Sequence, residues 1–276
     1  MPEAWFALCR LSDQRRNPMR NLLALKLEQY ATFSEHERRR LDTFISHRTK
    51  TYAPREMIVR EGEKVDQIYL VTSGLAVRSK SLADGGRQIM AFLIPGDLCD
   101  VEVFVLEHMD HDIIAVGETA CALIPAVEME AMLSESSKLT KALWWSTMTD
   151  SAVLRERIVD HGRRDARERI AHLFYELLIR YRMVEMAPDD SFSFPITQQE
   201  LADATGLTPV HANRTLQQLR DEGLIEFRNK ILTVLDPPAL KRAAQFQTNY
   251  LHLNRTERGD VAVRDRVGDL LDHRST

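Results

Sequence analysis

Two short helices joined by a glycine turn are predicted between residues 196 and 223, and this pattern constrains the fold more than any other part of the chain. Thr197 and Glu200 have the spacing of a capping box, which marks the start of a helix. Gly206 should end this helix, because glycine adopts the left-handed backbone conformation with little strain. Thr208 can then cap a second helix with its side-chain oxygen. The two helices have the order of a helix-turn-helix.

The second helix of the pair has an apolar face and a polar face. Ala212, Leu216 and Leu219 recur at helical spacing and should face the core. The segment LIEF-RNK-ILTV that follows Gly223 predicts a small two-stranded hairpin, or wing. An ordinary helical hairpin would share the apolar spacing, but the capped starts, the turn and the wing favour a motif whose second helix enters the DNA major groove. The side chains expected at DNA are Thr197, Gln198 and Thr208 on phosphates, and Pro209, Val210, His211, Arg214 and Gln217 in or beside the groove.

Composition and charge limit the class of protein. A chain of 276 residues with 44% hydrophobic and 28% charged residues is typical of a soluble protein with two domains. No apolar run is long enough to span a membrane and the N-terminus does not resemble a secretory signal, which predicts a cytoplasmic protein. Cys9, Cys99 and Cys121 are odd in number and widely spaced, which argues against a disulfide framework. The net charge is −4, so DNA binding must depend on where the basic residues lie.

The remainder of the chain predicts an α+β fold. Residues 22–47 look helical, and Ser34 and Glu37 have the spacing of another capping box. Between residues 51 and 125, short β-rich runs alternate with glycine turns, which predicts an antiparallel barrel or jelly roll. The domains expected are a sensor barrel at 22–137, a dimerisation helix at 138–162, a winged helix-turn-helix domain at 163–237, and a final helix with a flexible tail at 238–276.

A long helix is predicted between the barrel and the helix-turn-helix. It begins near Glu128, is broken near 134–137 and ends near Gly162. Its second part carries an imperfect apolar seam, which Arg155 interrupts. Such a stripe forms a dimer interface or packs on its own barrel, and the dimer is the interpretation we favour. The seam consists of Trp145, Met148, Ala152 and Val159.

This order of elements resembles the Crp/Fnr family of bacterial transcription regulators over residues 22–235. The resemblance depends on I-T-Q-Q-E-L at 196–201, on Arg214, which is similar to the family arginine that reaches bases, and on Pro95-Gly96-Asp97 in the barrel. It implies a homodimer that binds a two-fold symmetric site on double-stranded DNA. RNA polymerase is then the expected protein partner. The sequence has no GxSxG, P-loop or GxGxxG motif, so an enzyme is not expected, and an adaptor without DNA activity is another alternative.

Two departures from the family pattern concern the signal. Cyclic-AMP-binding members carry Gly-Glu-Leu followed by Arg-Ser or Arg-Thr, whereas this chain has D-V-E at 100–102 and His111-Asp112. Residues 88–137 contain no Lys or Arg and ten Asp or Glu, so a phosphate would meet uncompensated negative charge. Control by cyclic AMP is therefore not expected. Iron–sulfur members need several N-terminal cysteines, and only Cys9 lies near that end.

Three further features of the chain could carry chemistry, but each has a simpler interpretation. The run at 107–112, EHMDHD, contains possible metal ligands, but such a run on a loop is usually solvated charge. The spacing of the histidines does not indicate a haem pocket. Cys99 has acidic neighbours that disfavour its thiolate, so a buried inert thiol is favoured over a redox sensor. We expect no cofactor and no metal; the alternative is a regulator gated by another small ligand, haem or thiol redox.

Overall fold

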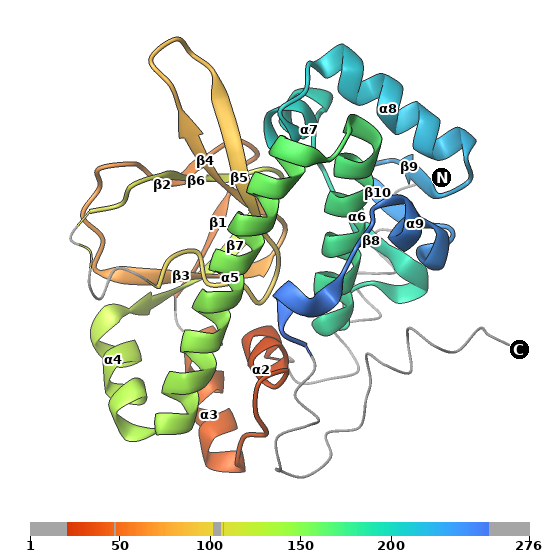
Figure 1. Cartoon of the computed structure of the whole chain (residues 1–276). Helices are drawn as coiled ribbons and strands as arrows, with labels where there is room; N and C mark the ends of the chain where they lie inside the picture. Colours follow the sequence, from red (N-terminus) through yellow and green to blue (C-terminus); the bar gives the residue numbers. More distant parts are fainter. Residues whose placement is uncertain (1–20, 47, 102–105, 107, 254–276) are drawn as a thin grey trace, which may run out of the picture.

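The computed structural model describes residues 21–46, 48–101, 106 and 108–253, and divides them into a barrel and a C-terminal domain. The long helix α5 (Ser137–Arg163) runs between these two parts (Figure 1). The prediction of an α+β fold with a β-rich first half and a helix-turn-helix in the second half is confirmed. Within the described residues, every helix is too short or too polar to cross a membrane.

Two antiparallel sheets face each other in the barrel. One sheet has the strand order β1-β7-β3 and the other has the order β2-β6-β4-β5. Non-consecutive strands are therefore neighbours in both sheets, as in a jelly roll. The strands are β1 (Thr49–Tyr52), β2 (Met57–Val59), β3 (Gln67–Ser73), β4 (Ala76–Ser81), β5 (Arg87–Leu93), β6 (Asp112–Ala115) and β7 (Thr119–Pro125).

Side chains alternate between the two faces of each sheet. Apolar side chains therefore pack in three places: between the two sheets, and on the outer face of each sheet. The inner faces meet in a buried cluster that includes Tyr52, Tyr69 and Ile113. The outer face of the β1-β7-β3 sheet packs against helices, whereas the outer face of the other sheet carries Val77 and Ile89 toward the C-terminal domain. Strands β3, β5 and β7 have other elements on their outer faces, and each of these strands contains a run of buried apolar residues.

Three short helices cover the outer face of the β1-β7-β3 sheet. They are α2 (Leu22–Leu27), α3 (Glu35–Ile45) and α4 (Ala126–Glu135). The capping box of Ser34 and Glu37 is present, with each backbone N–H bonded to the other side chain. The expected helical stretch at 22–47 is interrupted, because the cap residue Ser34 has an extended backbone with ψ of 162°. A helix that begins at such a cap cannot continue from the residues before it.

The predicted seam on α5 is partly wrong. The break near 134–137 is confirmed, since Ser136 leaves the helical conformation and caps α5. However, Ala152 is buried inside the chain, and Trp145 packs against Tyr30 with ring centroids 5.9 Å apart. Tyr30 follows α2, and this contact turns the Trp145 side of α5 toward its own barrel.

A different face of α5 is apolar and exposed. Trp144, Met148 and Ile158 are 71%, 55% and 73% exposed. At 100° per residue, this stripe is rotated by roughly 60° from the predicted seam. Its residues follow a spacing of four and three, which keeps them on one side of a helix that packs against another helix. The positions are Trp144, Met148, Ser151, Arg155, Ile158 and Gly162, and we call them the α5 stripe.

The C-terminal domain begins with α6 (Ala166–Met183), which Asp165 caps with a complete capping box. The predicted two-stranded wing is part of a three-stranded sheet with the order β8-β10-β9. The additional strand β8 has only three residues, which is too short for a periodic signal. The other elements are η2 (Pro188–Asp190), β8 (Ser191–Ser193), α7 (Gln198–Thr205), α8 (Pro209–Asp221), β9 (Ile225–Arg228), β10 (Ile231–Val234), α9 (Pro237–Ala243) and η3 (Thr248–Leu251).

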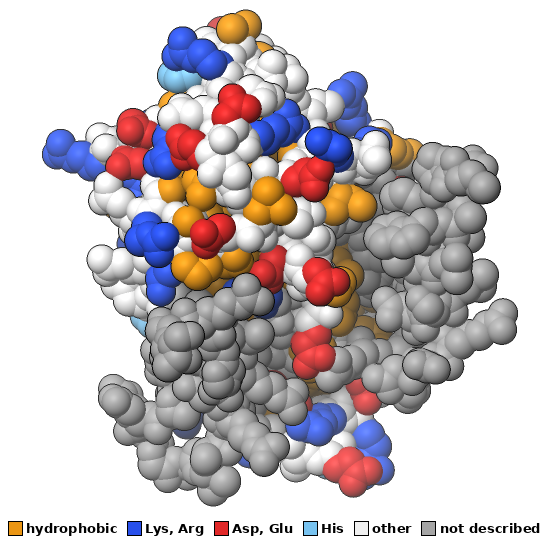
Figure 2. Space-filling view, turned by 90° about the vertical axis from the view of Figure 1, so that its right-hand side faces the viewer, with side chains coloured by type: hydrophobic (Ala, Val, Ile, Leu, Met, Phe, Trp, Pro, Cys, Tyr) orange, Lys and Arg blue, Asp and Glu red, His pale blue; other side chains and the backbone are white. Residues whose placement is uncertain are grey.

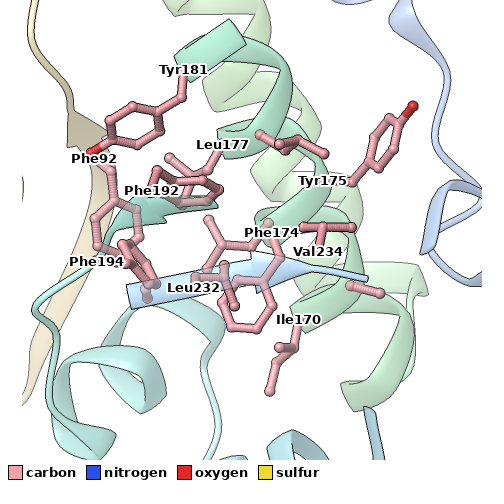
Figure 3. Packing of buried hydrophobic residues seen from close by; sticks show 14 of the residues in the cluster. Phe92, Ile170, Phe174, Tyr175, Leu177, Tyr181, Phe192, Phe194, Leu232 and Val234 are labelled. Carbon is pink, nitrogen blue, oxygen red and sulfur yellow. The ribbon is translucent and has the colours of Figure 1, made fainter. Parts of the chain in front are cut away.

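The apolar core of the C-terminal domain continues into the barrel (Figure 3). Phe174 on α6 packs edge-on against Phe194, with ring centroids 5.9 Å apart. Phe194 also contacts Phe92 of β5, with centroids 5.2 Å apart, so the same aromatic ring belongs to both contacts. Since α7 lies directly over β5, the first helix of the helix-turn-helix rests on the barrel. The C-terminal domain therefore has a defined place on the barrel.

Candidate DNA interface

Helix α7 and the turn after it are formed as the sequence predicts. The Thr197 Oγ1 accepts from the Glu200 N–H at 3.1 Å, and the Glu200 carboxylate accepts from the Thr197 N–H at 2.7 Å. Gly206 has φ of 63°, the left-handed conformation that its position requires. A β-carbon at Gly206 would lie 2.9 Å from the ring of His161 on α5. The turn thus needs glycine for its backbone angle and for its contact with α5.

Helix α8 presents a polar face to solvent. Its start is fixed by Thr208, whose Oγ1 accepts from the His211 N–H at 3.2 Å, with Pro209 in the first turn. Ala212, Leu216 and Leu219 are buried as predicted. Of the side chains expected at DNA, Pro209 and His211 are half-buried, because both lie toward the edge of the outer face. The others are exposed: Thr197, Gln198, Thr208, Val210, Arg214 and Gln217.

Arg214 lies at the centre of this face. Its guanidinium forms no hydrogen bond or ion pair with the other described residues, so its donors are free for a ligand. In contrast, Gln217 donates to Asp221 at 2.8 Å, which fixes the orientation of its amide. Val210, four residues before Arg214, is 82% exposed. The face therefore combines a free guanidinium, an oriented amide and a methyl surface.

Two acidic residues near α8, Glu222 and Asp203, are engaged by arginines. Glu222 accepts from Arg167 Nε at 2.9 and 3.0 Å, and these hydrogen bonds hold the pKa of Glu222 below its usual value. Asp203 on α7 accepts from Arg87 Nε of β5 at 2.8 Å. These contacts reduce the negative charge beside the face that would meet a phosphate backbone.

The tip of the wing presents two cations that the sequence analysis did not assign to DNA. Asn229 and Lys230 form the two-residue turn between β9 and β10, and both have positive φ. This is the conformation of a type I′ hairpin, in which asparagine is favoured. Arg228 and Lys230 are exposed at the tip, and Arg228 contacts Glu226 at 2.9 Å. Cations at a hairpin tip directly after a DNA-reading helix are the signal that could have identified them.

The surface of the C-terminal domain has no large region of a single charge on the side shown in Figure 2. There, basic and acidic side chains alternate around a group of apolar side chains. This agrees with the net charge of −4 and with the expectation that DNA binding depends on local placement of cations.

Residues 88–137 of the barrel carry less uncompensated negative charge than the sequence suggested. Asp97 is buried and bonds Lys26 at 2.8 Å and Arg180 at 2.6 Å, two cations from outside residues 88–137. Burial alone would raise the pKa of Asp97, but the charges of Lys26 and Arg180 hold it below its usual value. The statement that this charge is uncompensated was therefore wrong for Asp97. Glu102 and Glu107 lie outside the described residues.

An arginine that the sequence analysis overlooked reaches this segment from β4. Arg78 donates to the carbonyl oxygen of Cys99 from Nη2 at 2.7 Å and from Nε at 3.0 Å. It also lies 3.6 Å from Asp150 of α5. The guanidinium is thus already bonded to the chain, in contrast to an arginine held ready for a phosphate.

The described part of the barrel favours neither a metal site nor a reactive thiol. Residues 108–112 and the other described residues bring no three His, Cys, Asp or Glu side chains together, and Glu107 lies outside them. Cys99 and Cys121 are buried, and their mutual hydrogen bond, together with burial, raises the pKa of the Cys99 thiol. A raised pKa lowers the fraction of reactive thiolate.

The fold and the exposed face of α8 define a DNA-binding transcription regulator with a barrel domain. Residues 49–136 match the family described as a cyclic nucleotide-binding domain. Residues 168–243 match the Crp-like helix-turn-helix domain. With both modules in this order, the chain belongs to the Crp/Fnr family.

Individual relatives agree with this assignment. The chain is 25% identical over 184 residues to the transcriptional activator protein FnrL of Cereibacter sphaeroides, with 66% of this chain and 73% of that protein covered. It is 27% identical over 192 residues to the nitrogen fixation regulation protein FixK of Azorhizobium caulinodans, with 69% and 77% covered. The solved structure of FixK2 from Bradyrhizobium japonicum has a TM-score of 0.64 at 25% identity and covers 71% of this chain and 96% of that one. These relatives are transcription regulators and not enzymes.

Proposed function

We propose that the protein acts as a homodimer on a two-fold symmetric operator, and that cyclic AMP does not control it. The single observation that supports DNA reading best is the free guanidinium of Arg214 on an exposed, capped helix. We divide the chain into a sensor barrel at 22–137, a dimerisation helix at 138–162, a winged helix-turn-helix domain at 163–237 and a C-terminal segment at 238–276. RNA polymerase as a partner belongs to the same proposal and is supported by the name of the relative FnrL, a transcriptional activator. A cytoplasmic location belongs to it as well, because a bacterial regulator has to reach DNA.

In the proposed complex, α8 is the recognition helix. Arg214 bonds the O6 and N7 atoms of one guanine in each half-site, and Val210 contacts a thymine methyl group. Pro209, His211 and Gln217 lie beside these contacts. The phosphates of the DNA backbone are bound by Thr197, Gln198 and Thr208. Arg228 and Lys230 of the wing bind them as well.

Arg214→Ala should abolish base preference at one position in each half-site. The reason is that a bidentate arginine–guanine contact contributes about 1–3 kcal/mol of discrimination. Selection of binding sites from a random DNA library by wild type and variant measures the effect. Gln198→Ala serves as the control and should weaken binding to all sequences about equally. An unchanged base preference in Arg214→Ala would mean that another side chain reads the groove.

Cyclic AMP should not bind at micromolar concentration, because its phosphate needs a free guanidinium. Arg78 already bonds backbone carbonyls, and residues 88–137 contain no arginine. Calorimetric titration of the full-length protein tests this, with a cyclic-AMP-binding relative as the positive control. Saturable micromolar binding would refute the prediction. The alternative is control by another small ligand, haem or thiol redox; the burial of Cys99 and Cys121 argues against the last of these.

A further inference from the structure

The carboxylate of Asp97 joins three parts of the chain that are distant in sequence. Asp97 follows the Pro-Gly turn after β5 and is 2% exposed. Its Oδ1 accepts from Lys26 Nζ of α2 at 2.8 Å, and its Oδ2 accepts from the Ile94 N–H at 2.8 Å. Oδ2 also accepts from Arg180 Nη2 of α6 at 2.6 Å. One buried carboxylate therefore bonds the N-terminal helix, the barrel and the C-terminal domain.

Arg180 makes a second polar contact with the barrel and one with its own helix. Its Nη2 donates to the Phe92 carbonyl oxygen at 2.9 Å, and its Nη1 lies 3.6 Å from Glu176. Glu176 in turn bonds Arg157 of α5 at 2.8 Å. A chain of ion pairs thus runs from the barrel turn through α6 to the long helix. A guanidinium held on two oxygens has a defined orientation as well as a favourable energy.

The contact between the barrel and the C-terminal domain is apolar around Phe92, and a second ion pair joins Arg87 of β5 to Asp203 of α7 at 2.7 Å. Phe92 packs against Phe194, and Pro195 lies against Gly117, where a β-carbon would come within 3.0 Å. Apolar contacts are non-directional, so on their own they permit small shifts of one domain on the other. Buried ion pairs restrict such shifts, because a displaced charge would lose its partner while still buried.

We propose that Asp97 and Arg180 are positioning residues that fix the C-terminal domain on the barrel and so set the spacing between the two recognition helices of the dimer. This inference rests on the dimeric function proposed above. The barrel is tied to α5 through Arg78 and Lys26, which lie 3.6 and 3.8 Å from Asp150. With the α5 stripe at the dimer axis, the place of α8 relative to that axis depends on how the C-terminal domain sits on the barrel. Half-site separation on DNA reflects the distance between recognition helices.

Arg180→Gln and Asp97→Asn, both in the full-length protein, test the proposal. The probes are synthetic duplexes that carry, as inverted repeats, the half-site that the wild type selects from a random library, with spacers one or two base pairs shorter or longer. The wild type should bind the duplex with one spacer length at least about tenfold more tightly than the others, since each added base pair rotates and shifts one half-site relative to the other. For both variants, the affinities for duplexes with neighbouring spacer lengths should lie within about threefold of each other. Base preference within the half-site should stay unchanged. Arg180→Lys should restore part of the spacer preference.

Arg182→Gln is the matched control. Arg182 lies on the same helix and is 13% exposed, as is Arg180, but it bonds Asp190 of its own domain at 2.6 Å. This variant should keep the wild-type spacer profile. A folded Arg180→Gln with the wild-type profile overturns the proposal, and so does failure of both Arg180→Gln and Asp97→Asn to fold, which would assign the pair to stability alone. A wild type that binds a single half-site as a monomer would instead refute the dimeric function.

Discussion

Ile158→Glu is expected to give a monomer that binds the operator about a hundredfold more weakly than the wild type. Ile158 is 73% exposed and belongs to the α5 stripe, together with Trp144 and Met148. In a dimer these side chains would be removed from water, at about 25 cal/mol per Å² of buried apolar surface. A carboxylate in this contact would lose its hydration, and Arg155 of the same stripe, one helical turn away, would compensate its charge only in part. The two copies would face each other across the axis, so two such charges would be introduced.

The loss of DNA affinity follows from the loss of the second half-site. A dimer binds its second half-site as an intramolecular event, which raises affinity by about 10²–10⁴ over one domain. Sedimentation equilibrium and gel shift on one operator measure the two effects separately. Val127→Glu is the matched control, because Val127 is 71% exposed but lies on α4. A dimeric Ile158→Glu with wild-type affinity would exclude the α5 stripe as the interface, and monomers from Val127→Glu would place the interface elsewhere.

The parts of the fold that the sequence predicts well are those with local causes. The helix starts at Ser34, Thr197 and Thr208 each depend on a side chain that bonds a backbone N–H a few residues later. The turn at Gly206 depends on one backbone angle. Such features are encoded within a few residues, so a single sequence is sufficient to predict them.

The errors concern features that depend on distant partners. The strand at 49–52 was not recognised, because only Tyr52 of its four residues is buried and no alternation is visible. Two of the four seam residues on the long helix, Trp145 and Ala152, face the chain itself, and the side chain that packs on Trp145 is Tyr30, more than a hundred residues earlier. A periodic apolar pattern shows that a helix has a buried face, but it does not distinguish a face buried within the chain from one buried by a partner.

The same limit applies to the candidate sites. The exposed side chains of α8 could be predicted because helical periodicity places them opposite Leu216 and Leu219. The partners of Asp97, by contrast, lie 71 and 83 residues away in sequence. The acidic character of residues 88–137 was read from that segment alone, and the cations that compensate Asp97 come from α2 and α6. Charge balance at a buried site is a property of the folded chain.

Asp160→Asn should lower the free energy of unfolding by about 2–3 kcal/mol at pH 7. Asp160 is fully buried near the end of α5, where it accepts from Arg157 at 2.9 Å and from Arg164 at 2.7 Å. Burial alone would raise its pKa, but the ring of His172, 3.5 Å away, and the charge of Arg157 lower the pKa of Asp160 to about 2. Asparagine preserves the shape of the side chain and removes its charge, which leaves two arginines less well compensated.

The destabilisation should depend on pH in a defined direction. Because the pKa of Asp160 is about 2 in the folded protein and about 3.8 as an unperturbed carboxyl, its charge stabilises the fold fully above about pH 5. The difference between wild type and Asp160→Asn should therefore shrink as the pH falls from about 5 toward 2. Urea unfolding followed by circular dichroism over this range measures it.

Glu130→Gln is the control for Asp160→Asn, since Glu130 is an exposed carboxyl on α4 and its replacement should change stability by less than about 0.5 kcal/mol at any pH. A constant difference between wild type and Asp160→Asn from pH 7 to pH 3 would show that the variant acts through packing and not through charge.

The charge of Asp160 also has a structural consequence at the end of α5. Asp160 and Arg164 lie within the last turn before α6 begins, so the charge that stabilises the fold also holds the connection between the long helix and the C-terminal domain. Acid should loosen that connection over the same pH range, and hydrogen exchange of the backbone amides at 160–166, compared at each pH with the rest of α5, would report it independently of global unfolding.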